Sequence, residues 1–93
     1  MPHYTQYEGI RYDDPHLQAE FQRLVEEVAT AERARAPIQQ RHRQAEQERE
    51  AGDMSDSQFR AVDDQFISAN NKIAAAKRKV EEFLGRHKHY HTT

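Results

Sequence analysis

Apolar residues recur in two segments of this chain at steps that alternate between three and four positions. This heptad spacing places the repeating residues on a single stripe of an α-helix. In the second segment the stripe is uninterrupted, and it consists of Phe59, Val62, Phe66, Ala69, Ile73, Ala76, Val80 and Phe83. The first segment keeps the same rhythm with two polar members, and it consists of Leu17, Phe21, Leu24, Val28, Ala31, Arg35, Ile38, His42 and Ala45. Two helices are therefore expected, each with one stripe to bury.

The two stripes are symmetric about Gly52. Eight pairs of stripe residues lie at equal distances before and after this glycine, from Ala45 with Phe59 to Phe21 with Phe83. An antiparallel hairpin that turns at Gly52 requires this coincidence, because it brings equidistant residues to the same level in one seam. Large residues tend to face small ones, as interlocking helix packing prefers. The sequence predicts an all-α fold: a coiled-coil-like two-helix antiparallel hairpin with a short extended N-terminal arm and a short C-terminal tail.

Signals at the helix ends set the expected boundaries. Asp14 suits the N-cap and Pro15 the first helical position, and Gly52 suits the left-handed residue after a helix. Ser55 and Gln58 have the spacing of a capping box, which marks the start of the second helix. The expected units are an aromatic arm over 1–13, a hairpin over 14–85 with helices 14–51 and 55–85 around a turn at 52–54, and a histidine-rich tail over 86–93.

Three residues are expected to weaken the middle of the first helix. Pro37 removes a backbone hydrogen bond, so it should kink or locally open the helix. Arg35 and His42 place polar groups in the seam. The half of the hairpin that holds 17–31 and 73–84 should therefore be firm, and the half nearer the turn should be looser. Gly85 is expected to end the second helix.

One flank of the predicted hairpin is half apolar. Residues one position after each seam residue share a side of an antiparallel pair, and on this side they include Val25, Ala29, Ala36, Ile67, Ala74 and Leu84. The opposite flank is mostly charged. Two helices cannot cover an apolar flank by themselves, so the sequence predicts a partner-binding surface. Its proposed residues are Val25, Ala29, Ile67, Ala74 and Leu84, together with Tyr4, Tyr7 and Tyr12 of the arm.

Three kinds of cover for this flank stay open at this point. The tyrosine arm could fold back over its own hairpin. A second copy could pair with it, flank to flank, to form a four-helix bundle. A different protein could accept it as a helix docks in a groove. Association is favoured, because a seam with four alanines and two polar positions gains little free energy from burial.

Two clusters suggest weaker alternatives. Lys72, Lys77, Arg78 and Lys79 make a basic stretch of the second helix that could contact phosphates. The expected register sets acidic residues of the first helix beside it, which favours charge pairing within the hairpin. His87, His89 and His91 could share a metal ion, but this tail offers neither a carboxylate nor a cysteine and includes Lys88. No metal or other cofactor is therefore assigned.

Composition narrows the class of function. The 93 residues include no cysteine, which excludes disulfides and thiolate metal sites. The net charge of −2 disfavours non-specific binding to nucleic acid. No apolar run of membrane-spanning length, glycine-rich phosphate loop or paired nucleophile and base is present, so neither a membrane nor a small-molecule substrate is expected. The expectation is a non-enzymatic assembly protein that binds itself or a larger complex.

The same features suggest where such a protein works. With no signal peptide in sight, a bacterial or host cytoplasm is the default location. A small cysteine-free chain with a tyrosine-rich arm would suit a phage virion component. It would also suit a phage-type inhibitor or adaptor that docks on a host protein complex.

Overall fold

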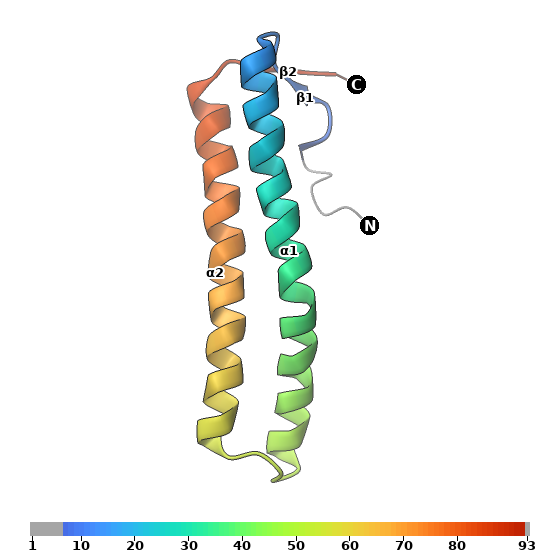
Figure 1. Ribbon diagram of the computed structural model, residues 1–93, viewed down its shortest axis with the longest axis vertical. Coiled ribbons are helices and arrows are strands. Elements are labelled where there is room, and N and C mark those ends of the chain that lie inside the picture. The colour runs from blue at the N-terminus through green and yellow to red at the C-terminus, as the bar shows by residue number, and fades with distance from the viewer. Residues whose placement is uncertain (1–6, 93) are drawn as a thin grey trace.

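The computed structural model describes residues 7–92 and shows two long antiparallel helices lying side by side (Figure 1). Helix α1 spans Pro15–Glu50 and helix α2 spans Asp56–Arg86. Two short strands, β1 at Ile10–Arg11 and β2 at Tyr90–His91, lie at the end opposite the turn. This end is called the arm end below. The predicted all-α helical hairpin is confirmed.

Both helices begin at the N-cap residues that the sequence predicts, Asp14 and Ser55. The Asp14 carboxylate accepts a 2.8 Å hydrogen bond from the amide of His16 at the start of α1. Ser55 and Gln58 form the complete capping box of α2: each side chain accepts from the other residue's backbone amide. Gly52 has a φ of +82°, the left-handed conformation that the turn requires.

The end of α2 differs from the prediction. Gly85 does not take the left-handed conformation that would stop a helix, and α2 continues through it to Arg86. His87 ends the helix instead by turning to an extended conformation, with φ at −125° and ψ at 130°. The stop is therefore set by the path of the chain into β2 rather than by the glycine.

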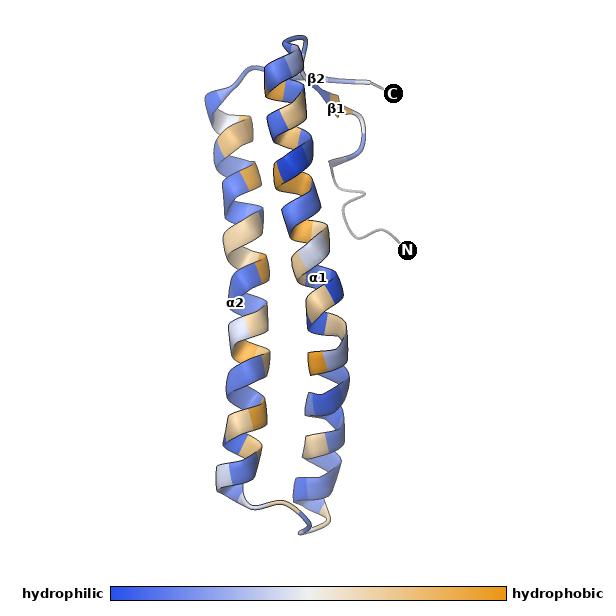
Figure 2. Cartoon of the chain, viewed as in Figure 1, coloured by the Kyte–Doolittle hydropathy of each residue, from blue (hydrophilic) through white to orange (hydrophobic). Residues whose placement is uncertain are grey.

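The register of the hairpin follows the symmetry about Gly52. The rings of Phe21 and Phe83, an equidistant pair, stack with their centroids 6.3 Å apart. Figure 2 shows apolar residues alternating with polar ones along both helices, as a seam between two amphipathic helices requires. Pro37 lies inside α1 without ending it, and α1 bends gently in its middle (Figure 1).

The apolar core is concentrated at the arm end. Arm and hairpin share one cluster of buried residues: Tyr7, Ile10, Tyr12, Phe21, Leu24, Val28, Ala76, Val80 and Phe83. In the half nearer the turn, only Ala45 and Ala69 of the seam are fully buried, while Ile38, Phe59, Val62 and Phe66 are half-buried. This part, residues 35–69, is called the turn half below. The hairpin therefore has one well-packed half and one thinly packed half.

The arm and the tail are joined by a small antiparallel pairing that the sequence did not predict. Ile10 pairs with His91 and Arg11 pairs with Tyr90. The amide of Thr92 donates a 2.6 Å hydrogen bond to the carbonyl of Gly9. Strands of two residues are too short to leave a periodic pattern, so the sequence of the tail shows only its histidines.

Gly9 should be less replaceable than Gly52, although both have positive φ. A Cβ at Gly9 would lie 2.6 Å from the carbonyl oxygen of Thr92, whereas a Cβ at Gly52 would meet nothing within 4 Å. Gly52→Ala should cost about 1–2 kcal/mol from the backbone conformation alone, and Gly9→Ala should cost more. Urea unfolding checks the order, with Gly85→Ala in α2 as a control that should raise stability. Equal losses at Gly9 and Gly52 would contradict the close approach of arm and tail.

Candidate interaction surface

The arm covers part of the flank that the sequence identified as a partner-binding surface. Tyr7 and Tyr12 are buried in the core of their own chain, each 5% exposed. Val25 and Leu84 of the flank are half-buried against this cluster. Ala29 is also buried, and Tyr4 lies outside the described residues. At the arm end, the described part of the arm thus provides the cover that two helices lack.

The rest of the flank is exposed. Ala36, Ile67 and Ala74 all reach solvent, and Ile67 is 48% exposed. These three residues are called the exposed flank below. Among residues 7–92, the other large apolar side chain with comparable exposure is Tyr90 in β2. An isolated exposed isoleucine is common on protein surfaces, but this one lies within the thinly packed turn half.

Two polar layers cross the seam of the turn half. Arg35 donates a 3.0 Å hydrogen bond to the side-chain oxygen of Asn70. His42 lies 2.9 Å from a carboxylate oxygen of Asp63. The Nε atom of Arg35 is buried without a hydrogen-bond partner, which costs stability. The polar residues therefore hold the helices in register here without the free energy that an apolar layer would add.

Two of the three tail histidines pack against aromatic rings at the arm end. His87 lies against Phe83, with ring centroids 4.5 Å apart, and His89 lies 5.8 Å from the ring of Tyr12. Burial raises the pKa of the Tyr12 phenol, whose hydroxyl donates to the His87 carbonyl at 3.5 Å. His91 is exposed on β2. Within residues 7–92 no three histidine or carboxylate side chains are placed to hold a metal ion.

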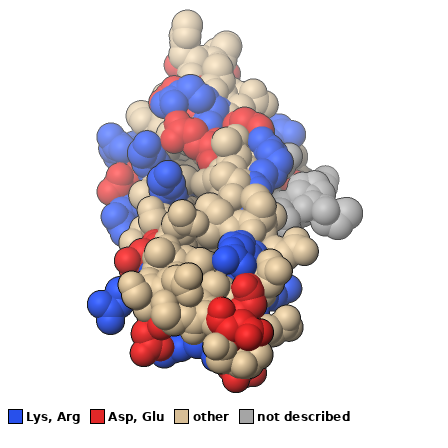
Figure 3. Space-filling view, turned by 60° about the horizontal axis from the view of Figure 1, so that its bottom comes forward, with Lys and Arg blue, Asp and Glu red and all other residues tan. Residues whose placement is uncertain are grey.

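The basic stretch of α2 is partly paired with α1. Lys79 forms an ion pair with Glu27 at 3.3 Å, while Lys72, Lys77 and Arg78 make no ion pair with a described residue. Figure 3 shows acidic and basic side chains intermixed over the visible face rather than gathered by sign. This mixture gives the visible face no strong field of one sign that would attract a polyanion.

On α1, charged residues of the polar flank form ion pairs with one another. Arg23 bridges Glu20 and Glu27, at 2.6 Å each. The hydrogen bond from Arg23 lowers the pKa of Glu20, and the same bond raises the pKa of Arg23. All three side chains remain substantially exposed, so these pairs contribute little to stability.

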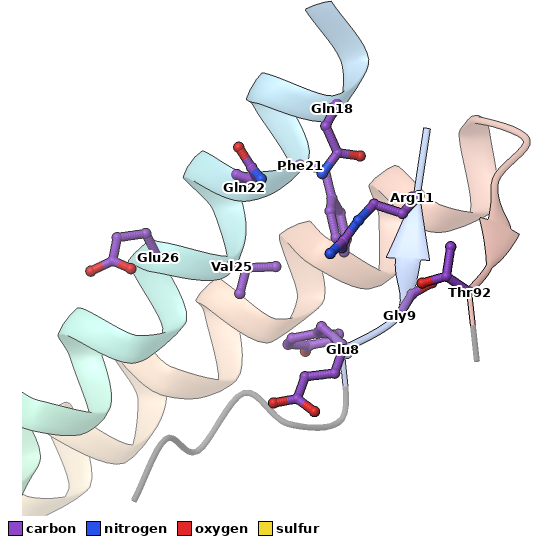
Figure 4. A pocket seen from close by; sticks show the side chains of 10 residues that line it. Glu8, Gly9, Arg11, Gln18, Phe21, Gln22, Val25, Glu26 and Thr92 are labelled. Carbon is purple, nitrogen blue, oxygen red and sulfur yellow. The ribbon is translucent and has the colours of Figure 1, made fainter. Parts of the chain in front are cut away.

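Two hollows were not expected from the sequence. One, of about 730 Å³, opens between the arm and α1 and is bordered by Glu8, Arg11, Gln18 and Glu26 (Figure 4). It exists only because the arm folds back. The other, of about 370 Å³, lies between the helices over Ala31, Ala34, Ile38 and Ala69. In the sequence, an alanine that borders a hollow cannot be distinguished from any other residue that favours a helix. Neither hollow brings together groups that resemble a catalytic site.

No described part of the chain suits a bilayer crossing. Within residues 7–92, neither helix contains an apolar stretch long enough to span the hydrocarbon layer.

The packing role of the tail gives a test that separates its histidines. His87→Ala should lower the free energy of unfolding by about 1 kcal/mol, because it removes ring contacts with Phe83 and Tyr12. His91→Ala should leave it nearly unchanged, because that side chain is exposed. Urea unfolding at pH 7.5 checks both. Equal effects of the two substitutions would show that the tail is not anchored through His87.

Comparison with known proteins finds no relative that could assign a function. No protein-family model matches the chain, and no significant match is found among curated proteins or solved structures. The function must therefore be inferred from the surfaces described above.

Proposed function

We propose that this chain is a non-enzymatic helical-hairpin interaction module that acts by helix packing, as a self-associating unit or an accessory subunit of a larger assembly. The observation that carries the proposal is Ile67, a large apolar side chain that is 48% exposed beside a half-buried seam. Fully burying such a side chain in an interface is worth about 1.5–3 kcal/mol. The turn half has the most to gain from a partner.

The distribution of cover along the hairpin supports this proposal. At the arm end, Tyr7, Ile10 and Tyr12 take the place of a third helix. Below them the exposed flank continues the same face of the hairpin. A second hairpin laid on that face would complete a bundle of the usual four-helix kind. A partner helix from another protein would bury the same residues, as would the host complex of an inhibitor or adaptor.

Self-association is tested by absolute mass in solution. The wild-type protein should have a mass of two or more chains of 11.0 kDa each. The Ile67→Glu variant should be a monomer, because burying an unpaired carboxylate in the interface is costly. Light scattering across a concentration series measures both. Gln65→Glu is the matched control: it adds the same charge at an exposed site on the opposite flank of α2 and should leave the mass unchanged.

A monomeric wild type would contradict self-association. The exposed flank would then be tested for binding a foreign partner, with Ile67→Glu as the variant that should lose it.

Nucleic-acid binding is the alternative, and one observation favours it. Lys72, Lys77 and Arg78 make no ion pair with residues 7–92. Such binding would weaken steeply with salt and would be lost when these residues become glutamine. The assembly proposal instead expects neither the salt dependence nor the loss.

A further inference from the structure

A second stripe of residues runs along α2, outside the seam. Arg60, Ile67, Ala74 and Glu81 recur every seven positions, which places them in one line on a helix that keeps a heptad seam. All four side chains are exposed, and the middle two belong to the exposed flank. The described part of the arm lies on the side of α1 that faces away from α2 (Figure 1), so it leaves this line open. The line is called the outer stripe below.

Charged residues on and beside the outer stripe follow an order that is antisymmetric about its midpoint. The midpoint lies halfway between Ile67 and Ala74. Each charge on the turn side of this point has an opposite charge at a matching distance on the arm side: Asp63 and Asp64 mirror Lys77 and Arg78, and Arg60 mirrors Glu81. The stripe therefore carries a charge pattern that complements its own reversed copy.

Most of these six charges have no counterion in their own chain. Asp63 contacts the ring of His42 at 2.9 Å. The other five make no ion pair with any residue of 7–92: Arg60, Asp64, Lys77, Arg78 and Glu81. Solvated charges are ordinary on a helix surface. An antisymmetric order is more specific, because it is what a two-fold pairing of identical helices requires.

We propose that the partner of the hairpin is a second copy of this chain, with the two α2 helices packed antiparallel along the outer stripe. The inference rests on the proposed function, because it names the partner of the same surface. In this register Ile67 packs against Ala74 of the second copy, a large residue against a small one. Asp64 faces Arg78 of the second copy. The two-fold axis repeats each of these contacts, so every pair occurs twice.

Other arrangements of the outer stripe lose this complementarity. In a parallel pairing each residue lies beside its own copy, so every charge would meet a like charge, which is unfavourable across an interface. A shift of the antiparallel register by one heptad, in either direction, sets Asp63 and Asp64 opposite uncharged residues. The order of charges thus selects one orientation and one register, both by attraction and by repulsion.

Charge reversal at one pair tests the arrangement. Asp64→Arg should raise the dissociation constant of the dimer at least about tenfold, because it turns two ion pairs into two like-charge contacts. Arg78→Asp should have a similar effect. The double variant Asp64→Arg/Arg78→Asp restores opposite charges and should return the constant toward that of the wild type. Light scattering over a concentration series measures all four proteins.

A matched control and a mixture sharpen this test. Glu82→Arg makes the same change of charge as Asp64→Arg at an exposed site of α2 outside the outer stripe, so it should leave the constant unchanged. Mixed in equal amounts, the Asp64→Arg and Arg78→Asp chains should associate with each other. Each chain then faces the opposite charge at both positions.

The orientation of the two helices is tested by spin labels, because the chain has no cysteine of its own. A nitroxide on Asn71→Cys lies next to the two-fold axis, so it should be within about 20 Å of its copy, given the usual spacing of packed helices. A nitroxide on Ser57→Cys should be about 40 Å from its copy, from the rise of 1.5 Å per residue. Both sites are exposed. Electron paramagnetic resonance measures the two distances.

The outcomes separate this inference from the proposed function. A wild-type oligomer that Ile67→Glu dissociates, but that charge reversal at Asp64 leaves intact, would keep the proposed function and overturn the antiparallel pairing. Short distances at both labels would overturn it as well, because they indicate parallel helices. A double variant no stronger than the single variants would do the same. A monomeric wild type would overturn both the pairing and self-association.

Discussion

A hairpin of two helices has no third layer, and the rest of this structure follows from that constraint. Each helix buries one stripe against the other, but residues beside the seam need a further cover. At the arm end the cover comes from the chain itself, through Tyr7, Ile10 and Tyr12. In the turn half polar residues enter the seam, and Ile67 stays exposed. The packing of the molecule thus changes from one end to the other.

Tyr12 joins the elements of the arm end. Its ring contacts Phe21 on α1 and Phe83 on α2, at centroid distances of 5.6 and 5.3 Å. It also meets His87 and His89, which lead into β2. The arm is therefore held by side-chain packing as well as by the short pairing of β1 with β2. Contacts between residues far apart in sequence thus hold the two helices together at the arm end, whereas at the other end the turn at Gly52 connects them.

The parts of this fold that could be predicted depend on local or periodic signals. The heptad spacing and the symmetry about Gly52 determine the two helices and their register. The capping box at Ser55 is decided within four residues, and it is present as expected. These signals are strong for two reasons. The heptad spacing repeats the need to bury an apolar stripe along the whole helix, and the capping box supplies hydrogen-bond partners for the free amides at a helix start.

The parts that could not be predicted depend on contacts between distant segments. The pairing of Ile10 with His91 involves strands of two residues, which carry no periodicity. The sequence alone leaves the cover of the flank open, because a tyrosine can be buried in its own chain or in a partner. Gly85 looked like a helix stop, but the path of the tail decided the end of α2. The hollow over Ala31 and Ala34 depends on how closely two helices approach.

The weakness of the turn half is specific rather than general. Arg35 and His42 each reach a polar side chain on α2, so the seam keeps its register although it buries little apolar surface. A polar layer of this kind favours one alignment over others at a cost in stability. That cost falls in the half that carries Ile67, away from the buried cluster of the arm end.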